Sequence, residues 1–200
     1  MEQVRSFIAI ELPDEAKSAL ARIQAQLKTG QQPSVKWVDP YSIHLTLKFL
    51  GNVAVAKTDA ITGAIEAAAG ETSPFTLELK GLGAFPNLRR VKVVWIGVGG
   101  ELAPLSQLHQ RIESNLSTLG FAPESRQFSP HLTLARIREQ ASPDQRQNFG
   151  QLIASTRLEA TCRFTVNSVS LMRSQLTSAG PIYHRTSSVR MKKPLSKITD

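Results

Sequence analysis

Hydrophobic and polar positions along the chain follow two periods, one typical of strands and one typical of helices. Alternating or continuous β-branched runs predict strands over 5–12, 35–38, 42–50, 75–82, 91–98, 129–134, 162–171 and 182–191. Apolar stripes spaced three and four residues apart predict helices over 13–29, 56–69, 102–119 and 143–155. Many of the strands alternate or are linked as hairpins, so the pattern favours an α+β fold with antiparallel sheets over a doubly wound fold.

Two of the predicted helices have clear end signals. Pro13 stands in the first turn of the first helix, and Asp14 and Glu15 follow it at the positive end of the helix dipole. Gly30 is the predicted stop of this helix, and Gly120 is the predicted stop of the third.

The tetrapeptide His-Leu-Thr-Leu occurs twice, beginning at His44 and at His131, 87 residues apart, each time with a serine two positions earlier. Strand alternation places Thr46 beside His44 and Thr133 beside His131, with leucines on the opposite face. The two copies use half of the four histidines and occupy equivalent places in two half-chains of similar layout. Two facing imidazoles can act as general base and general acid, and two hydroxyls can hold an anionic group between them. This chemistry suits the opening of a phosphodiester without a metal.

Composition indicates an ordinary globular protein with an anionic partner. The 200 residues form one domain or two tightly joined lobes, and 41% of them are hydrophobic. The formal net charge is +8, which favours binding to nucleic acid, although a solvated basic surface remains an equal alternative from charge alone. The basic residues gather at 89–92 and near the C-terminus, where 192–200 reads as a basic tail: Arg89, Arg90 and Lys92, then Arg185, Arg190, Lys192, Lys193 and Lys197.

Other features narrow the class further. No stretch approaches the apolar length that spans a bilayer, and the N-terminus lacks the core and cleavage site of a signal peptide, so we expect a cytoplasmic protein. The single cysteine, Cys162, lies in an alternating stretch and is expected to be a small core residue. Zinc-finger spacing, a glycine-rich phosphate loop and an RNP-type aromatic motif are not visible in the sequence.

The chain resembles the 2H phosphoesterase superfamily, which is named for two His-x-Thr motifs. More narrowly, it is similar to the bacterial RNA 2′,3′-cyclic phosphodiesterases, also called 2′-5′ RNA ligases. The resemblance spans nearly the whole chain and is carried by 5–10, 44–51, 81–86, 94–98, 129–136 and 174–183. Its most specific parts are Lys-Phe-Leu-Gly after the first motif and Ala-Arg after the second.

The resemblance implies a bilobal fold over 1–200, with two pseudo-symmetric antiparallel sheets flanked by helices around a central cleft. It implies a metal-independent enzyme without a cofactor, which opens 2′,3′-cyclic phosphates of RNA ends or nucleotides to 2′-phosphates. We expect a monomer, although the sequence leaves the oligomeric state open. By the same resemblance, His44 donates a proton to the leaving ribose oxygen and His131 accepts one from the attacking water. Thr46 and Thr133 hold the phosphate oxygens.

Three further residues are candidates for substrate contact. Arg136 matches a family arginine that contacts phosphate, but strict alternation puts it on the face opposite His131, so it needs a strand bulge to reach the site. Otherwise it is a surface or core-edge arginine. Phe49 can stack a base, although its Leu-Phe-Leu-like context favours the core, and Tyr183 can line the cleft or cap the core. His109 and His184 have no partner by spacing and are predicted on the surface.

Alternatives to hydrolysis remain open at this point. Joining of RNA ends through a 2′-5′ linkage can be the physiological direction of the same chemistry. A nucleotide- or RNA-binding module without chemistry is a rival from another class, although binding alone does not require two histidines. A metal site is disfavoured because Asp39 is the only carboxylate close in sequence to either motif.

Overall fold

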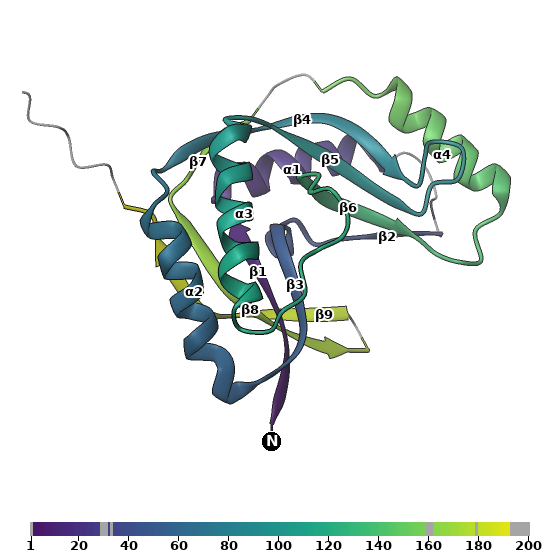
Figure 1. The fold of residues 1–200 in the computed structure, drawn as a ribbon. Coiled ribbons are helices and arrows are strands. Elements are labelled where there is room, and N and C mark those ends of the chain that lie inside the picture. Colours follow the sequence, from purple (N-terminus) through teal and green to yellow (C-terminus); the bar gives the residue numbers. More distant parts are fainter. Residues whose placement is uncertain (1, 29–31, 33, 159–161, 179, 193–200) are drawn as a thin grey trace, which may run out of the picture.

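The computed structural model describes residues 2–28, 32, 34–158, 162–178 and 180–192 (Figure 1). It confirms the predicted α+β class, because its strands form two antiparallel sheets with helices packed on them. Sheet A has the order β3-β1-β8-β9, formed by His44–Ala54, Gln3–Glu11, Ser168–Thr177 and Gly180–Arg190. Sheet B has the order β2-β6-β5-β4-β7, formed by Val35–Trp37, His131–Ile137, Val93–Gly100, Phe75–Phe85 and Arg163–Val166.

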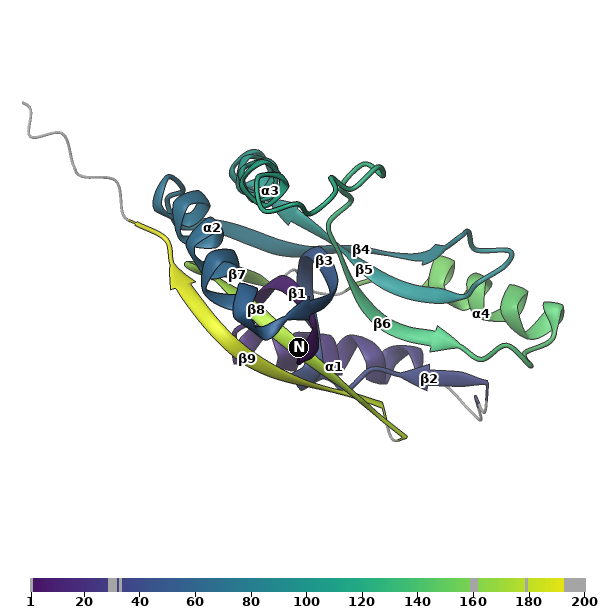
Figure 2. The same cartoon turned by 60° about the horizontal axis from the view of Figure 1, so that its bottom comes forward.

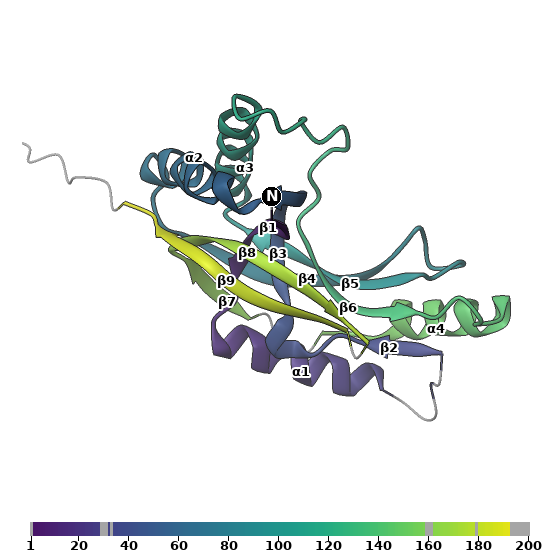
Figure 3. The same ribbon diagram turned by 90° about the horizontal axis from the view of Figure 1, so that it is seen from below.

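The described chain contains four α-helices, α1 Asp14–Leu27, α2 Thr58–Gly70, α3 Leu102–Ser117 and α4 Pro143–Ser155. α2 and α3 lie side by side, whereas α4 packs near β4 (Figures 1 and 3). A capping box explains where α4 begins, because the Ser142 hydroxyl accepts from the Gln145 N–H and the Gln145 side chain accepts from the Ser142 N–H. The predicted stop at Gly30 and the tail residues 193–200 lie outside the described residues.

The chain builds a strand–helix–strand–helix unit twice. In the first unit β1 and β3 pair with each other and flank α1 in sequence, and in the second β5 and β6 pair and flank α3. A motif histidine begins the second strand of each unit, His44 in β3 and His131 in β6. β2 joins the units, since it precedes β3 in sequence and lies alongside β6 (Figure 2). The equivalent places predicted from sequence are therefore equivalent places in the fold.

One hydrophobic core holds both sheets and their helices together. It includes buried side chains from the strands of both units, among them Ile8, Ile10, Leu45, Ile96 and Leu132. A smaller cluster of Phe7, Ala9 and Met172, with Tyr183 packed on it, lies on the other face of sheet A. β1 is thus covered on both faces, which explains why its sequence reads as a continuous apolar run.

Two strand predictions are corrected by the structure. The single strand expected over 162–171 is two strands: β7 pairs with β4 in sheet B, and β8 pairs with β1 in sheet A. The chain passes between the sheets at Asn167, where the buried apolar positions shift from Phe164 and Val166 to Val169 and Leu171, so the change of phase marks the change of partner that the single predicted strand overlooked. The strand predicted over 75–82 is longer, because β4 continues to Phe85, which pairs with Val93.

Candidate active site

Both motif histidines are held in the same way by the backbone. Nδ1 of His44 lies 3.0 Å from the Ser42 carbonyl oxygen, and Nδ1 of His131 lies 2.7 Å from the Ser129 carbonyl oxygen. A carbonyl can only accept, so Nδ1 carries a proton in each ring and Nε2 is left for substrate. The contact uses the main chain of the two serines, which explains the equivalent placement without a role for their hydroxyls.

Aromatic side chains enclose the first histidine. The Phe7 ring stacks on the His44 imidazole at 4.6 Å between centroids, and the Tyr183 ring meets it edge-on at 4.9 Å. Burial lowers the pKa of His44, although the hydrogen bond to Ser42 and the negative charge of Glu11 oppose this shift. His44 therefore gives up its proton more readily than an exposed imidazole.

The second histidine has a matching but more open aromatic setting. The Phe85 ring lies edge-on to His131 at 5.0 Å, and Trp95 lies 6.3 Å away. Trp95 covers Gly83, where an added Cβ would clash with the indole ring. Glycine at this position therefore lets the indole lie flat on the strand beside His131.

Each motif threonine shares a sheet face with its histidine. Thr46 pairs with Ala9 of β1, and Thr133 pairs with Trp95 of β5. Both are partly exposed, whereas the leucines on either side of each threonine are buried. The alternation predicted from the sequence is confirmed over these residues, and the face that carries each His-x-Thr pair is called the motif face below.

A bulge follows each threonine and brings one more side chain onto the motif face. In β6, Thr133 pairs with Trp95 and Ala135 with Val94, so Leu134 has no opposite residue in β5. Ala135 is buried as a result, and Arg136 is exposed on the side of Thr133. The bulge required to bring Arg136 to the site is present.

β3 contains the equivalent bulge. Thr46 pairs with Ala9 and Lys48 with Ile8, so Leu47 is unpaired and Lys48 turns into the protein. Phe49 then lies on the motif face, with its ring 6.2 Å from Phe7. Its side chain is 67% exposed, so the interpretation of Phe49 as a core residue is wrong.

Tyr183 connects the surroundings of the two motifs. Burial raises the pKa of its hydroxyl, while the positive charges of Arg136 and Arg5 lower it. Arg136 of the second motif strand therefore acts electrostatically on the tyrosine that packs against His44 of the first. The strands β3 and β6 also contact each other directly.

The sequence reading missed an acidic group beside the first motif. Glu11 lies opposite His44 in the strand register and accepts two hydrogen bonds of 2.7 Å from Arg185. It also accepts one of 2.6 Å from the Ser170 hydroxyl. Burial raises the pKa of Glu11, but the hydrogen bonds and charge of Arg185 outweigh this and leave it lowered. A charged residue ending the apolar run of the first strand was the available signal.

Other candidates are placed as follows. The Asp39 carboxylate accepts from the Tyr41 N–H at 3.1 Å and so caps a short 3₁₀ turn. Within the described ranges, no three His, Cys, Asp or Glu side chains gather as a metal site. His184 is exposed as predicted, but His109 is largely covered, with its ring stacked on Phe128 at 4.1 Å. Cys162 packs against the core yet is only partly buried.

None of the helices that the structure describes combines the length and apolar character needed to cross a bilayer.

A duplicated unit that presents an imidazole and a hydroxyl from each copy defines a two-histidine phosphoesterase, as the sequence resemblance implied. The chain belongs to the 2′-5′ RNA ligase superfamily, whose family model matches residues 12–177. The RNA 2′,3′-cyclic phosphodiesterase of Methanothermobacter thermautotrophicus is 36% identical over 181 residues, which cover 90% of this chain and 95% of that protein. The protein of the same name from Aquifex aeolicus is 30% identical over 184 residues, covering 92% and 95%.

Solved structures agree with this assignment. The protein TT0787 of Thermus thermophilus superposes with a TM-score of 0.77 at 25% identity, covering 96% of this chain and all of that one. Escherichia coli LigT complexed with 3′-AMP gives a TM-score of 0.74 at 26% identity with the same coverage. LigT has also been solved with phosphate, at a TM-score of 0.69 and 25% identity. The predicted family and the two-sheet fold are thereby confirmed.

Proposed function

We propose that this protein opens terminal 2′,3′-cyclic phosphates of RNA to 2′-phosphates by metal-free general acid–base catalysis. The observation that carries the proposal is the identical seating of two imidazoles, each with Nδ1 on a carbonyl and Nε2 left for substrate. The relatives named RNA 2′,3′-cyclic phosphodiesterase support the reaction, and the 3′-AMP and phosphate complexes of LigT support a nucleotide phosphate as ligand.

In the proposed reaction, His131 accepts a proton from water as the water oxygen bonds to phosphorus. The bond from phosphorus to the 3′ oxygen breaks, and His44 gives its proton to that oxygen. The 2′-phosphate remains, and solvent returns the two imidazoles to their starting protonation states. The two imidazoles exchange roles in the reverse direction, because the forward acid is the reverse base. This assignment of donor and acceptor comes from the family resemblance.

The other site residues divide into two groups. Thr46 and Thr133 donate hydroxyl hydrogen bonds to the non-bridging phosphate oxygens, and Arg136 supplies a positive charge beside them. Phe49 offers an exposed aromatic face to the base or ribose, next to Phe7. Tyr183 supports the His44 ring from its edge.

The direct test is incubation with 2′,3′-cyclic AMP in EDTA, followed by chromatography of the product against 2′-AMP and 3′-AMP. We expect 2′-AMP alone, at a rate that the chelator leaves unchanged. A 3′-AMP product, or a rate lost in EDTA and restored by zinc or manganese, contradicts the proposal. Binding of 3′-AMP without any turnover favours the non-catalytic module.

Ligation is a second candidate, because the matching family is named for 2′-5′ RNA ligase activity. An RNA ending in a 2′,3′-cyclic phosphate and one starting with a 5′ hydroxyl test it directly. A joined product resistant to nucleases that require a 3′-5′ linkage supports ligation. Its yield against hydrolysis at equal enzyme concentration decides which direction prevails.

The proposal also specifies the setting of the enzyme. We propose a cytoplasmic monomer that acts on RNA ends or cyclic nucleotides. Light scattering of the purified protein tests the monomer, and a dimer that persists at nanomolar concentration contradicts it.

A further inference from the structure

The two bulges decide which side chains join the site, so the groups that fix the bulges matter for function. A bulged residue loses its ladder partner, and its polar backbone groups need other partners when they are buried. At both bulges, side chains from the helix of the other unit lie within bonding reach.

At the second motif, the supporting side chain is Gln24 of α1. Its Nε2 donates to the Leu134 carbonyl at 3.0 Å and to the Val38 carbonyl at 2.7 Å. The Leu134 carbonyl also accepts from the Val38 N–H at 2.9 Å. Gln24 is fully buried, and because two carbonyls face its amide group, the NH₂ must point toward them. Gln24 thus ties the bulged residue of β6 to the chain that leads into the first motif.

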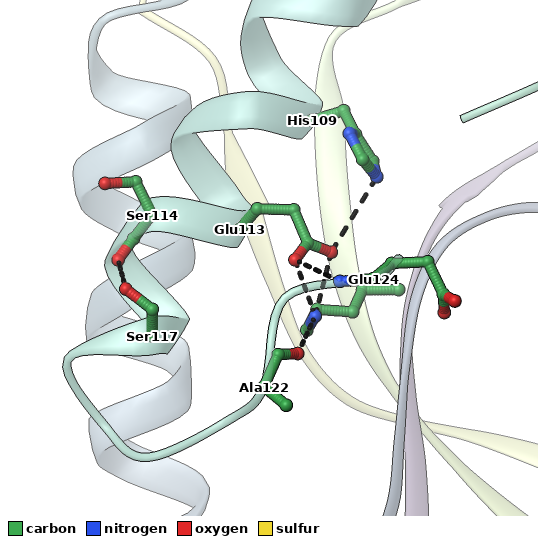
Figure 4. A network of polar contacts seen from close by, with 7 residues as sticks. His109, Glu113, Ser114, Ser117, Ala122 and Glu124 are labelled. Carbon is green, nitrogen blue, oxygen red and sulfur yellow. Dashed lines mark hydrogen bonds and ion pairs between the residues drawn. The ribbon is translucent and has the colours of Figure 1, made fainter. Parts of the chain in front are cut away.

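At the first motif, the supporting group is a buried ion pair between Lys48 and Glu113 of α3. Lys48 Nζ lies 2.8 and 2.7 Å from the two Glu113 oxygens and donates to the Ala122 carbonyl at 2.9 Å. Glu113 also accepts from the Glu124 N–H at 3.1 Å. Figure 4 shows the Glu113 carboxylate joined to His109 and Glu124, with the Ala122 carbonyl on the far side of the lysine ammonium. The pair therefore joins the first-motif strand to the loop that leads into the second motif.

His109 completes this group one helical turn before Glu113. Its Nε2 lies 3.8 Å from a Glu113 oxygen. Burial lowers the pKa of the ring, as does the positive charge of Lys48, while the negative charge of Glu113 opposes the shift. The His109 ring thus adds a second basic group beside the Glu113 carboxylate.

We propose that Gln24, and the pair Lys48–Glu113 with His109, are positioning residues. Gln24 fixes the β6 bulge, which places Arg136 on the motif face. Lys48, Glu113 and His109, together called the Lys48 group, fix the β3 bulge, which places Phe49 on that face. Each motif strand is thus held in place by side chains from the helix of the other unit. The kinetic test of this inference rests on the proposed function. The phosphate-binding test does not depend on that function.

The first experiment is a double-mutant cycle between Gln24→Met and Arg136→Ala, assayed on 2′,3′-cyclic AMP. If Gln24 acts through Arg136, Gln24→Met lowers kcat/KM at least tenfold in the native background and less than twofold in the Arg136→Ala background. Gln32→Met is the matched control, because among the described residues the Gln32 amide donates to the Leu27 carbonyl at 2.8 Å, away from both bulges. It should leave kcat/KM within twofold of the native value.

Equal losses in both backgrounds, or no loss in either, overturn the role of Gln24. If Gln24→Met fails to give a cooperative thermal melt, Gln24→Asn replaces it, because its amide is one methylene too short to reach both carbonyls. Calorimetric titration with inorganic phosphate separates this inference from the proposed function. Even if the protein does not hydrolyse the cyclic nucleotide, Gln24→Met should weaken phosphate binding only where Arg136 is present. Equal phosphate affinity in all four proteins overturns the inference.

The second experiment tests the Lys48 group with Glu113→Gln. We expect Glu113→Gln to lower kcat/KM on cyclic AMP at least fivefold. In the Phe49→Ala background, the same substitution should cost at most half as much on a logarithmic scale. Arg111→Met is the control on the same helix, because it removes the ion pair of 3.2 Å with Glu71 on another side of α3. A loss as large from Arg111→Met, or full additivity with Phe49→Ala, overturns the positioning role.

Discussion

The strands β3 and β6 share a backbone design but present different side chains. Each begins with a histidine bonded to a carbonyl two residues back, continues through a threonine, and bulges at the next leucine. The residue that the bulge returns to the motif face is Phe49 in β3 and Arg136 in β6. The two strands therefore share the same backbone positions. The residue that follows the bulge on the motif face is aromatic in β3 and cationic in β6.

The inward residues differ as well. The position before Phe49 is Lys48, which is buried and paired with Glu113, whereas the position before Arg136 is the small buried Ala135. A buried ammonium requires a compensating carboxylate, so the first motif is coupled to α3 by charge. The second is coupled to α1 by the neutral amide of Gln24. The difference indicates that the two halves hold their motif strands in place by different interactions.

Loss of either histidine should have the largest effect on kcat, and the effect should be similar for the two strands. We expect His44→Ala and His131→Ala each to reduce kcat by at least about a hundredfold with little change in KM, because proton transfer occurs in the transition state. The double mutant should be scarcely slower, since the two act as a unit. Steady-state kinetics on cyclic AMP measure this, and activity within a fewfold of native in either single mutant would reject the assignment.

The residues after the bulges should then separate the two strands. Arg136→Ala should cost about 1.5–3 kcal/mol in kcat/KM on any cyclic phosphate, because a charge-assisted contact to the reacting group is lost. Phe49→Ala should cost about 1–3 kcal/mol on a cyclic nucleotide through lost stacking. Ribose 2,3-cyclic phosphate, which has no base, is the discriminating substrate. Equal sensitivity of both mutants to the missing base would remove the proposed division of roles.

Loss of either threonine hydroxyl should again have a similar effect in the two strands. Thr46→Val and Thr133→Val keep the side-chain shape but remove the hydroxyl donor. We expect each to reduce kcat/KM by about 1–2 kcal/mol, equally on mononucleotide and oligonucleotide, because both contact the phosphate itself. Kinetics on the two substrate lengths check this, and a loss confined to the oligonucleotide would place that threonine away from the reaction.

The pH profile distinguishes the first histidine by its acidic neighbour. Because its pKa is lowered, His44 loses its proton at a lower pH than an exposed imidazole does. The alkaline limb of the kcat/KM profile should therefore lie below the usual pH range of imidazole. Glu11→Gln removes a charge that raises this pKa and should move that limb to still lower pH. Glu78→Gln, which breaks the 3.2 Å pair with Arg163 in sheet B, is the matched control. A limb that stays in place in Glu11→Gln means that His44 is not the titrating acid.

The smallest effect is expected from basic residues beyond the reacting phosphate. Arg89, Arg90 and Lys92 lie in the exposed β4–β5 connection, next to the end of β6 where the Ile137 N–H donates to the Lys92 carbonyl. Neutralising each should leave cyclic AMP turnover unchanged and flatten the salt dependence of oligonucleotide binding by roughly one log–log unit or less. Titrations at several salt concentrations measure this slope. An unchanged slope in all three mutants means that this cluster is a solvated surface.

Much of the site could be predicted from one strand at a time. His44 and Thr46 share a face because successive strand residues alternate, and the same holds for His131 and Thr133. The helices followed from their apolar stripes, and the resemblance to the family followed from the residues that flank each motif. These features depend on residues a few positions apart, so the linear order of side chains is sufficient to reveal them.

Only the tertiary structure decided what lies beyond each threonine. Whether Phe49 faces the solvent and Lys48 the interior depends on the partner register, in which Leu47 has no opposite residue on β1. The same applies to Arg136, and to His109, whose ring is covered by Phe128. A bulge reverses the inward and outward phase of a strand by a pairing that involves residues far apart in the chain. The sequence therefore determined the chemistry of each motif, and the packing of one unit against the other determined which neighbours share it.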